Sequence, residues 1–494
     1  MPRQLPADCL NEVFKHLEDK VTLHSCLSVN RLWCEISVQV LWRNIWNYNT
    51  LIACLPNESK EVLCKNEIII STPTSKHLLF NYTTFIKSIS IDDIDKKIKG
   101  ILKNHQLVDS ENIMDFNKNN DNNDNKCMIV TQEIIKMIMS QISLKELKLN
   151  YHYKPSYIPN ETFVSYPGAI DCLKNLSELS FNSNLDPELF YQLSQMCHNI
   201  QSLSMDIGHG ISNGLMELIS VQQNLKWFKT FQTSPCEDFV ILIPSLIELS
   251  NTLIKLSFYG RGYSIPLSFV AEFTNLQELA ISFDDPSFEG FEKLQHVVFS
   301  QLRILKFQRG VPKLGYLVNF FANNGKNLEE IYIEYYKISL NSTIAKYCPN
   351  LKSLYTIFME NEIKTLQKIF NSCQRLESIE VWCGSWNEGG GCYLKESELL
   401  QMVINDSPKT FNELKIYYTF RTDSALFPKD LESFFTSWTN RVPQKSISFI
   451  INSLNKNGLA NEKENMDVIQ KYIKLGVVRK FKITNNYNKI CDFD

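Results

Sequence analysis

The chain has 494 residues, of which 44% are hydrophobic and 21% are charged, and its formal net charge is −3. A single hydrophobic core usually stops growing at about 250–300 residues, so this length predicts several domains or an array of repeats. The near-neutral charge provides no basic field for nucleic acid or anionic lipid, and the near-average composition excludes a largely disordered chain.

The first 46 residues contain short segments with the apolar spacing of helices. Leu10, Val13 and Leu17 fall on one face of a helix that Pro6 can open, because proline has a preset φ and no N–H to lose. We expect a second helix with Thr22 as its N-cap, followed by a third. Three helices in about 45 residues bury too little apolar surface to be stable alone, so this segment needs a partner or a larger body.

The residues of this segment resemble the F-box, an adaptor-docking module of ubiquitin ligases. The resemblance rests on Leu5-Pro6, Val29-Asn30-Arg31-Leu32-Trp33 and Leu41-Trp42, which occur in the order of that module. It implies that residues 1–46 dock the Skp-type adaptor of a cullin–RING, SCF-type ligase. It assigns the adaptor contact to Leu5, Pro6, Leu10, Val13, Leu17 and Trp33. The alternative is an N-terminal helical cap with a coincidental Leu-Pro start.

Residues 47–143 predict a region that connects this segment to the rest of the chain. They contain one repeat-like strand, Ile86 to Ile91, and a helical candidate around residues 51–64. Residues 115–126 are almost all polar, so burial cannot offset the entropy lost on ordering them. We therefore expect a disordered Asn/Asp-rich loop at residues 115–126.

A six-residue pattern, apolar-x-x-apolar-x-apolar, recurs through residues 144–484. Its first positions include residues 176, 200, 225, 253, 276, 302, 328, 351 and 376. These steps fit the period of about 20–29 residues that is typical of leucine-rich repeats. Each repeat has alternating apolar residues, as in a strand, and then helical spacing. The predicted fold is α/β, with a three-helix F-box, a curved solenoid of parallel inner strands and outer helices, and a tail at residues 485–494.

Single cysteines precede several repeats, which resembles the cysteine-containing subtype that often follows F-boxes. They are Cys172, Cys197, Cys348 and Cys373. Because they are not paired as Cys-x-x-Cys, small buried hydrophobes are favoured over the alternative of a metal site. The start of the chain lacks the apolar core of a signal peptide, so we expect reduced thiols and a cytoplasmic or nuclear protein.

Catalytic motifs are absent from the sequence. It contains no Gly-x-x-x-x-Gly-Lys-Ser/Thr loop, no His-Glu-x-x-His and no Gly-x-Ser-x-Gly, and its eight His are scattered. We expect no enzyme activity, no cofactor and no metal. The longest apolar stretch, Phe239 to Leu249, is too short to span a bilayer. We therefore expect no membrane and no nucleic acid among the partners.

Aromatic residues accumulate at strand positions that point away from the repeat core. Aromatic side chains dominate binding hot spots, so these positions predict a surface for a protein client. The predicted client-binding residues are Trp227, Phe231, Tyr259, Tyr332, Tyr355, Trp382 and Tyr417. Alternatively, the rings fold back over the repeats or a C-terminal segment covers them. An extended loop around Gly389–Gly391 is either a plain surface loop or a second place for a partner.

Together, the two resemblances imply a substrate-recognition subunit of an SCF-type ligase. The F-box would dock the adaptor, and the repeats would hold a protein client near the ubiquitin-charged enzyme. One alternative is a non-degradative interaction scaffold that uses the same repeats. Another is an inhibitor or sensor of a small ligand, for which the sequence shows no lined pocket.

Overall fold

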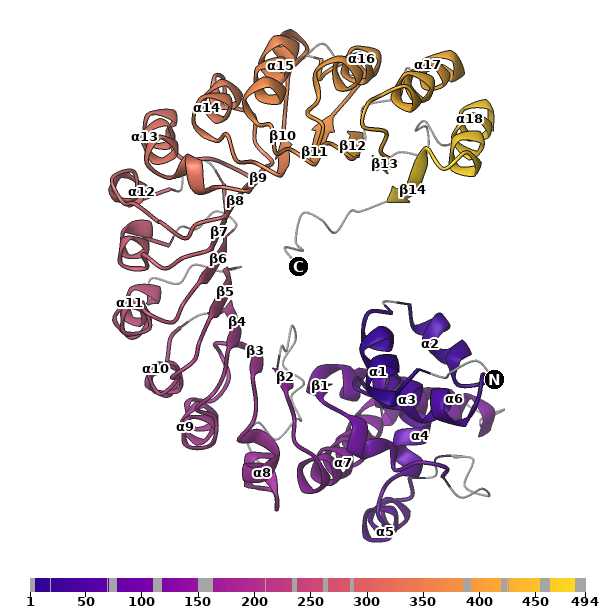
Figure 1. Ribbon diagram of the computed structural model, residues 1–494. Helices are drawn as coiled ribbons and strands as arrows, with labels where there is room; N and C mark the ends of the chain where they lie inside the picture. The colour runs from indigo at the N-terminus through magenta and orange to yellow at the C-terminus, as the bar shows by residue number, and fades with distance from the viewer. Residues whose placement is uncertain are drawn as a thin grey trace. The chain divides into compact units, whose positions relative to one another are not determined.

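The computed structural model forms two compact units, Met1–Thr230 with Pro235–Thr252 and Phe231–Ser234 with Leu253–Asp494. In each unit the strands run parallel and the helices between successive repeat strands lie along one side of them (Figure 1). The structure describes residues 5–17, 19–68, 70, 78–109, 118–149, 163–208, 210–232, 238–260, 265–284, 288–384, 392–418, 424, 426–453 and 463–484.

The first unit begins with three short helices whose apolar faces meet in one core. They are α1 (Ala7–Lys15), α2 (Lys20–Cys26) and α3 (Arg31–Leu41). The N-cap of α2 is Asp19 and not Thr22, because the Asp19 carboxylate accepts the N–H groups of Val21 and Thr22. The side chain of Asn30 caps α3 by accepting the N–H of Trp33 at 2.9 Å. Side-chain caps thus fix the starts of α2 and α3.

The connecting region is mostly helical. Its elements are α4 (Tyr48–Ala53), α5 (Asn57–Lys65), η1 (Tyr82–Phe85), β1 (Ser88–Ser90), α6 (Ile91–Asp109) and α7 (Lys118–Gln141). The predicted strand is therefore present as β1, and the helical candidate is present as two helices that Pro56 separates.

The segment predicted as a disordered loop differs in the structure, because α7 already begins at Lys118. Residues 115–117 lie outside the described part of the chain. Helix α7 packs on α6: Asp124 lies 2.5 Å from the ammonium of Lys99, and the buried Cys127 thiol donates to Asp95 at 3.2 Å. Packing between two helices stabilises a helical segment whose composition alone does not favour it.

The repeats of the first unit pair strand to strand in chain order. The order is β1, β2 (Glu146–Leu149), β3 (Glu178–Asn182) and β4 (Ser202–Ile207), while β5 (Trp227–Gln232) crosses the division between the units. The intervening helices are η2 (Phe163–Ser165), α8 (Ala169–Leu173), α9 (Pro187–Met196), α10 (Asn213–Ser220) and α11 (Phe239–Glu248). Helix α9 starts at Asp186-Pro187, where the Asp186 carboxylate accepts the N–H of Glu188 at 2.8 Å.

The second unit continues the same alternation of strand and helix. Its strands are β6 (Lys255–Gly260), β7 (Glu278–Phe283), β8 (Ile304–Gln308), β9 (Glu330–Ile333), β10 (Ser353–Thr356), β11 (Ser378–Trp382), β12 (Glu413–Tyr418), β13 (Ile447–Ser453) and β14 (Val478–Thr484). Its helices are η3 (Leu267–Glu272), α12 (Phe291–Leu294), α13 (Leu314–Asn324), η4 (Gly325–Asn327), α14 (Leu340–Tyr347), η5 (Glu360–Glu362), α15 (Ile363–Ser372), α16 (Glu396–Asp406), α17 (Pro428–Thr439) and α18 (Lys463–Lys474).

The apolar triplets predicted from the sequence form the core of both units. In neighbouring strands the same repeat position is aligned, as in the row Leu354, Ile379 and Leu414, and all three side chains are buried. A shift of one residue would turn these side chains to the opposite face. The predicted leucine-rich architecture of parallel strands and outer helices is therefore confirmed within each unit.

The cysteines before the repeats are buried side chains. The thiol of Cys197 donates to the carbonyl of Leu173 at 3.5 Å, and that of Cys373 donates to the carbonyl of Cys348 at 3.2 Å. Burial raises the pKa of the Cys197 thiol to about 12. These thiols therefore act as small hydrophobes, and those of Cys197 and Cys373 also tie one repeat to the preceding one.

Two amide side chains perform a comparable linking role where no cysteine is present. Gln222 accepts the N–H of Ile200 at 3.0 Å and donates to the carbonyl of Cys197 at 2.7 Å. Asn324 accepts the N–H of Phe299 at 2.7 Å and donates to the carbonyl of Val297 at 2.9 Å. These two amides are buried, and the sequence pattern did not identify them.

We expect Asn324→Ala to lower the free energy of unfolding by about 2–4 kcal/mol, because it leaves a buried N–H and a buried carbonyl without their partner. Urea denaturation measures this loss. Asn350→Ala is the matched control, since its more exposed amide makes one bond to the Lys326 carbonyl at 2.8 Å, and it should cost about 1 kcal/mol or less. Equal losses for both variants would contradict the linking role of Asn324.

Candidate protein-binding surfaces

The residues assigned to an adaptor contact do not share one environment. Leu5 and Val13 are exposed, with 54% and 51% of their surface accessible, and Pro6 is exposed beside them. Leu17 and Trp33 are half-buried, and the edge of the Trp33 ring packs on Phe14 with 5.1 Å between centroids. Of the residues assigned to the adaptor, Leu5 and Pro6 are thus exposed just before α1, and Val13 is exposed on it.

Leu10 lies in the core of the three helices and not on their surface. It is 2% exposed and packs in the cluster that also contains Phe14, Leu23 and Trp42. The apolar side chains of α1 span more of the helix than the core can cover. Leu10 and Phe14 therefore face the core, and Val13 is left exposed to solvent. The assignment of Leu10 to an adaptor surface is corrected by this burial.

The second unit contains an aromatic cluster at the predicted client-binding positions. Tyr332 on β9 stacks on Tyr355 on β10, with centroids 4.1 Å apart, and Trp382 on β11 stacks on Tyr417 on β12 at 4.8 Å. The indole N–H of Trp382 donates to the Tyr355 hydroxyl at 2.7 Å and joins the two pairs. We call Tyr332, Tyr355, Trp382, Tyr393 and Tyr417 the aromatic cluster.

The rings of the aromatic cluster cover one another. Tyr355 is 5% exposed and Tyr417 is 6% exposed, whereas Tyr332 and Trp382 are half-buried. Burial, followed by the nearby charge of Glu334, raises the pKa of Tyr417 to about 12. The surface that the cluster offers to a partner therefore belongs mainly to Tyr332 and Trp382.

Tyr393 belongs to the same cluster, although it does not occupy one of the predicted strand positions. It follows the long insertion after β11, and its ring meets Trp382 edge to face at 5.3 Å. Tyr393 pairs with Met359, and Leu394 pairs with Cys383, so the returning segment is held against the repeats. The Gly389–Gly391 loop lies outside the described residues.

The other predicted client-binding rings have close contacts of their own. In the second unit, Phe231 and Tyr259 stack with centroids 4.7 Å apart, and Tyr259 is 7% exposed. In the first unit, Trp227 is half-buried, and the ammonium of Lys229 lies 5.7 Å from its ring centroid. Among the predicted client-binding residues, Trp227 thus belongs to the first unit, whereas the stacked rings belong to the second.

Charged side chains on the strands of the second unit form a bridge between repeats. The carboxylate of Glu278 on β7 lies 3.3 Å from the ammonium of Lys255 on β6 and 2.7 Å from that of Lys306 on β8. Burial opposes ionisation of Glu278, but hydrogen bonds and charge from the two lysines hold its pKa below the usual value. This network links three neighbouring strands.

Within the described part of the chain, no group of three or more His, Cys, Asp or Glu side chains could hold a metal ion. None of the described helices is both long enough and apolar enough to cross a bilayer.

Comparisons with known proteins leave the family open. No family model matches the chain. No curated protein matches it either. Among solved structures, the chain is similar to an LRR protein of Leptospira interrogans, with 14% identity and a TM-score of 0.32 over 71% of this chain and 85% of that one. A likeness this distant carries no argument about function.

Proposed function

We propose that this protein is the substrate-recognition subunit of an SCF-type ubiquitin ligase. Helices α1 to α3 dock a Skp-type adaptor, and the leucine-rich repeats bind a protein client. The chain itself performs no chemistry in this role, because it only brings the client close to the ubiquitin-charged enzyme.

The observation that carries this proposal is a group of exposed apolar side chains on a very small helical body. Leu5, Val13, Val21 and Val29 are 54%, 51%, 71% and 56% exposed, with Leu5 just before α1 and the other three on or between α1, α2 and α3. Exposed apolar side chains concentrated in one segment are typical of protein interaction sites. The sequence of the same segment resembles an F-box.

We expect the double variant Leu5→Ala/Val13→Ala to weaken adaptor binding by about 2 kcal/mol, or roughly 30-fold, because both side chains are available to a partner. Biolayer interferometry with purified adaptor measures this change. Val240→Ala/Ile241→Ala on α11 is the matched control, since these side chains are 55% and 49% exposed outside the three helices. Unchanged binding by the first variant, or equal loss in the control, would contradict the docking surface.

We assign client binding to the aromatic cluster, in which the half-buried rings of Tyr332 and Trp382 project from strands of the parallel sheet. Aromatic rings that are already held in place lose little entropy when a partner covers them. Burial and then the charges of Glu334 and Glu380 raise the pKa of Tyr417, while Lys415 is aligned with Glu380 on the neighbouring strand, so side chains of both signs lie near the rings.

Ubiquitin transfer to captured clients distinguishes the ligase from a scaffold. The complex with adaptor, cullin and RING subunits should modify proteins that co-purify with the wild-type chain. The variant Trp382→Phe, which removes the indole N–H bonded to Tyr355 but keeps a ring, should capture less client while binding adaptor normally. Client capture without adaptor binding would support the non-degradative scaffold instead.

A further inference from the structure

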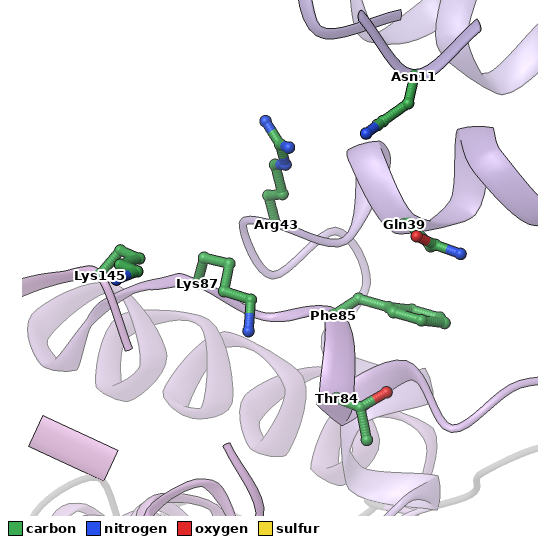
Figure 2. A pocket seen from close by; sticks show the side chains of 7 residues that line it. All are labelled: Asn11, Gln39, Arg43, Thr84, Phe85, Lys87 and Lys145. Carbon is green, nitrogen blue, oxygen red and sulfur yellow. The ribbon is translucent and has the colours of Figure 1, made fainter. Parts of the chain in front are cut away.

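A pocket of about 530 Å³ lies in the first unit, beside the three N-terminal helices. Its volume falls within the range of about 300–1,000 Å³ that is typical of small-molecule sites. Figure 2 shows its lining side chains, which come from α1, α3, the segment after α3, η1 and the residues that precede β1 and β2. The sequence pattern gave no sign of this pocket.

Three cations line the pocket at matching positions of neighbouring chain segments. The N–H of Lys87 donates to the carbonyl of Arg43 at 2.8 Å, and the N–H of Lys145 donates to the carbonyl of Lys87 at 2.8 Å. Neighbouring segments in such a ladder are about 4.8 Å apart, so the three side chains start close together. Like charges in adjacent positions are unfavourable unless an anion balances them.

The charges of these cations are not balanced by ion pairs within the described residues. The ammonium of Lys87 reaches the carbonyl of Ser143 at 3.5 Å, and that of Lys145 reaches the carbonyl of Asn175 at 3.4 Å. These long bonds leave donors free on both ammonium groups. Glu12 is close enough for Arg43 to contribute to its lowered pKa, but that carboxylate pairs with Lys15.

The remaining lining side chains suit a polar ligand with an organic part. Asn11 and Gln39 supply amide groups from α1 and α3, and the ring of Phe85 forms part of the wall (Figure 2). The lining residues include no Asp or Glu. An anion with a small organic body would therefore meet donors on several sides and one apolar surface.

We infer that this pocket binds a small molecule that carries a diphosphate or polyphosphate group. A phosphomonoester carries about −1.5 to −2 charges at pH 7, so a single phosphoryl group does not balance three cations, whereas two linked groups do. Arg43 is suited to bidentate contact with phosphoryl oxygens, and Lys87 and Lys145 act as point charges. The site stands independently of adaptor docking and client binding.

Isothermal titration of the full chain with inorganic pyrophosphate tests the site. We expect Lys87→Gln/Lys145→Gln to weaken pyrophosphate binding about tenfold or more, because two charge-assisted contacts are lost. Lys97→Gln/Lys226→Gln is the matched control, since it removes the same charge from two exposed lysines outside the pocket and should leave binding within about twofold. Arg43→Gln provides an independent variant at an exposed side chain if the double variant is unstable.

Several results would overturn the inference. No binding of pyrophosphate at millimolar concentration would remove the site, and equal weakening in the control would reduce it to a general charge effect. Orthophosphate binding as tightly as pyrophosphate would contradict the requirement for two phosphoryl groups. A phosphoserine peptide that binds more tightly than pyrophosphate would make the ligand a phosphorylated protein and not a small molecule.

Discussion

Tyr355→Ala should lower the free energy of unfolding by about 3–5 kcal/mol, although the sequence placed this residue on an exposed binding face. The ring is 5% exposed, stacks on Tyr332 and accepts a hydrogen bond from Trp382. Its removal leaves a cavity between two strands and an indole N–H without its partner. Urea denaturation followed by tryptophan fluorescence measures the loss.

Two further variants distinguish the contribution of the Tyr355 ring to stability from that of its hydroxyl and from the effect of removing any tyrosine. Tyr355→Phe keeps the stacking and should cost about 1 kcal/mol, because the ring stays in place and only the hydrogen bonds of its hydroxyl, including the one from Trp382, are lost. Tyr191→Ala on α9 is the control, since Tyr191 is 40% exposed and its truncation should cost less than about 1 kcal/mol. If Tyr355→Ala costs no more than this control, the aromatic cluster is open and the stacking is not formed in solution.

Leu10→Ala should destabilise the first unit by about 2–5 kcal/mol, because a fully packed leucine is replaced within the core of α1 to α3. Val13→Ala on the same helix should change the free energy of unfolding by less than about 0.5 kcal/mol, since Val13 is 51% exposed. Thermal and urea denaturation of the two variants give the comparison.

The pair also tests the corrected assignment of α1. If Leu10→Ala leaves the free energy of unfolding unchanged and only abolishes adaptor binding, Leu10 contacts the partner, as the sequence indicated. The burial of Leu10 in the core of α1 to α3 would then be wrong. If stability falls while Val13→Ala alone weakens adaptor binding, the inner and outer sides of α1 have the separate roles that the structure gives them.

The strand positions could be predicted from the sequence because alternate side chains of a strand point to the same face, and the face that is buried has to be apolar. The triplets around Leu354 and Ile379 are buried as expected. The start of α9 was predictable because Asp186 and Pro187 act locally. Features set by neighbouring residues were therefore within reach of the sequence, although the N-cap of α2 is Asp19 and not the expected Thr22.

Features set by distant residues could not be read in the same way. Tyr393 joins the aromatic cluster only because the insertion after β11 returns to the repeats. Lys87 and Lys145 are 58 residues apart in sequence and meet only through strand pairing. Helix α7 extends into the polar segment because α6 is there to support it, and nothing within residues 115–126 indicates this.

The buried thiols between repeats give each unit its own chemical reporter of opening. A thiol reacts with alkylating reagents as the thiolate, and burial both raises the pKa of Cys197 and Cys348 and excludes the reagent. Each thiol can therefore react only after its own repeat has opened. The alkylation rate of Cys197 therefore reports local opening in the first unit, and the alkylation rate of Cys348 reports local opening in the second. A single alkylating reagent can measure the two opening rates separately.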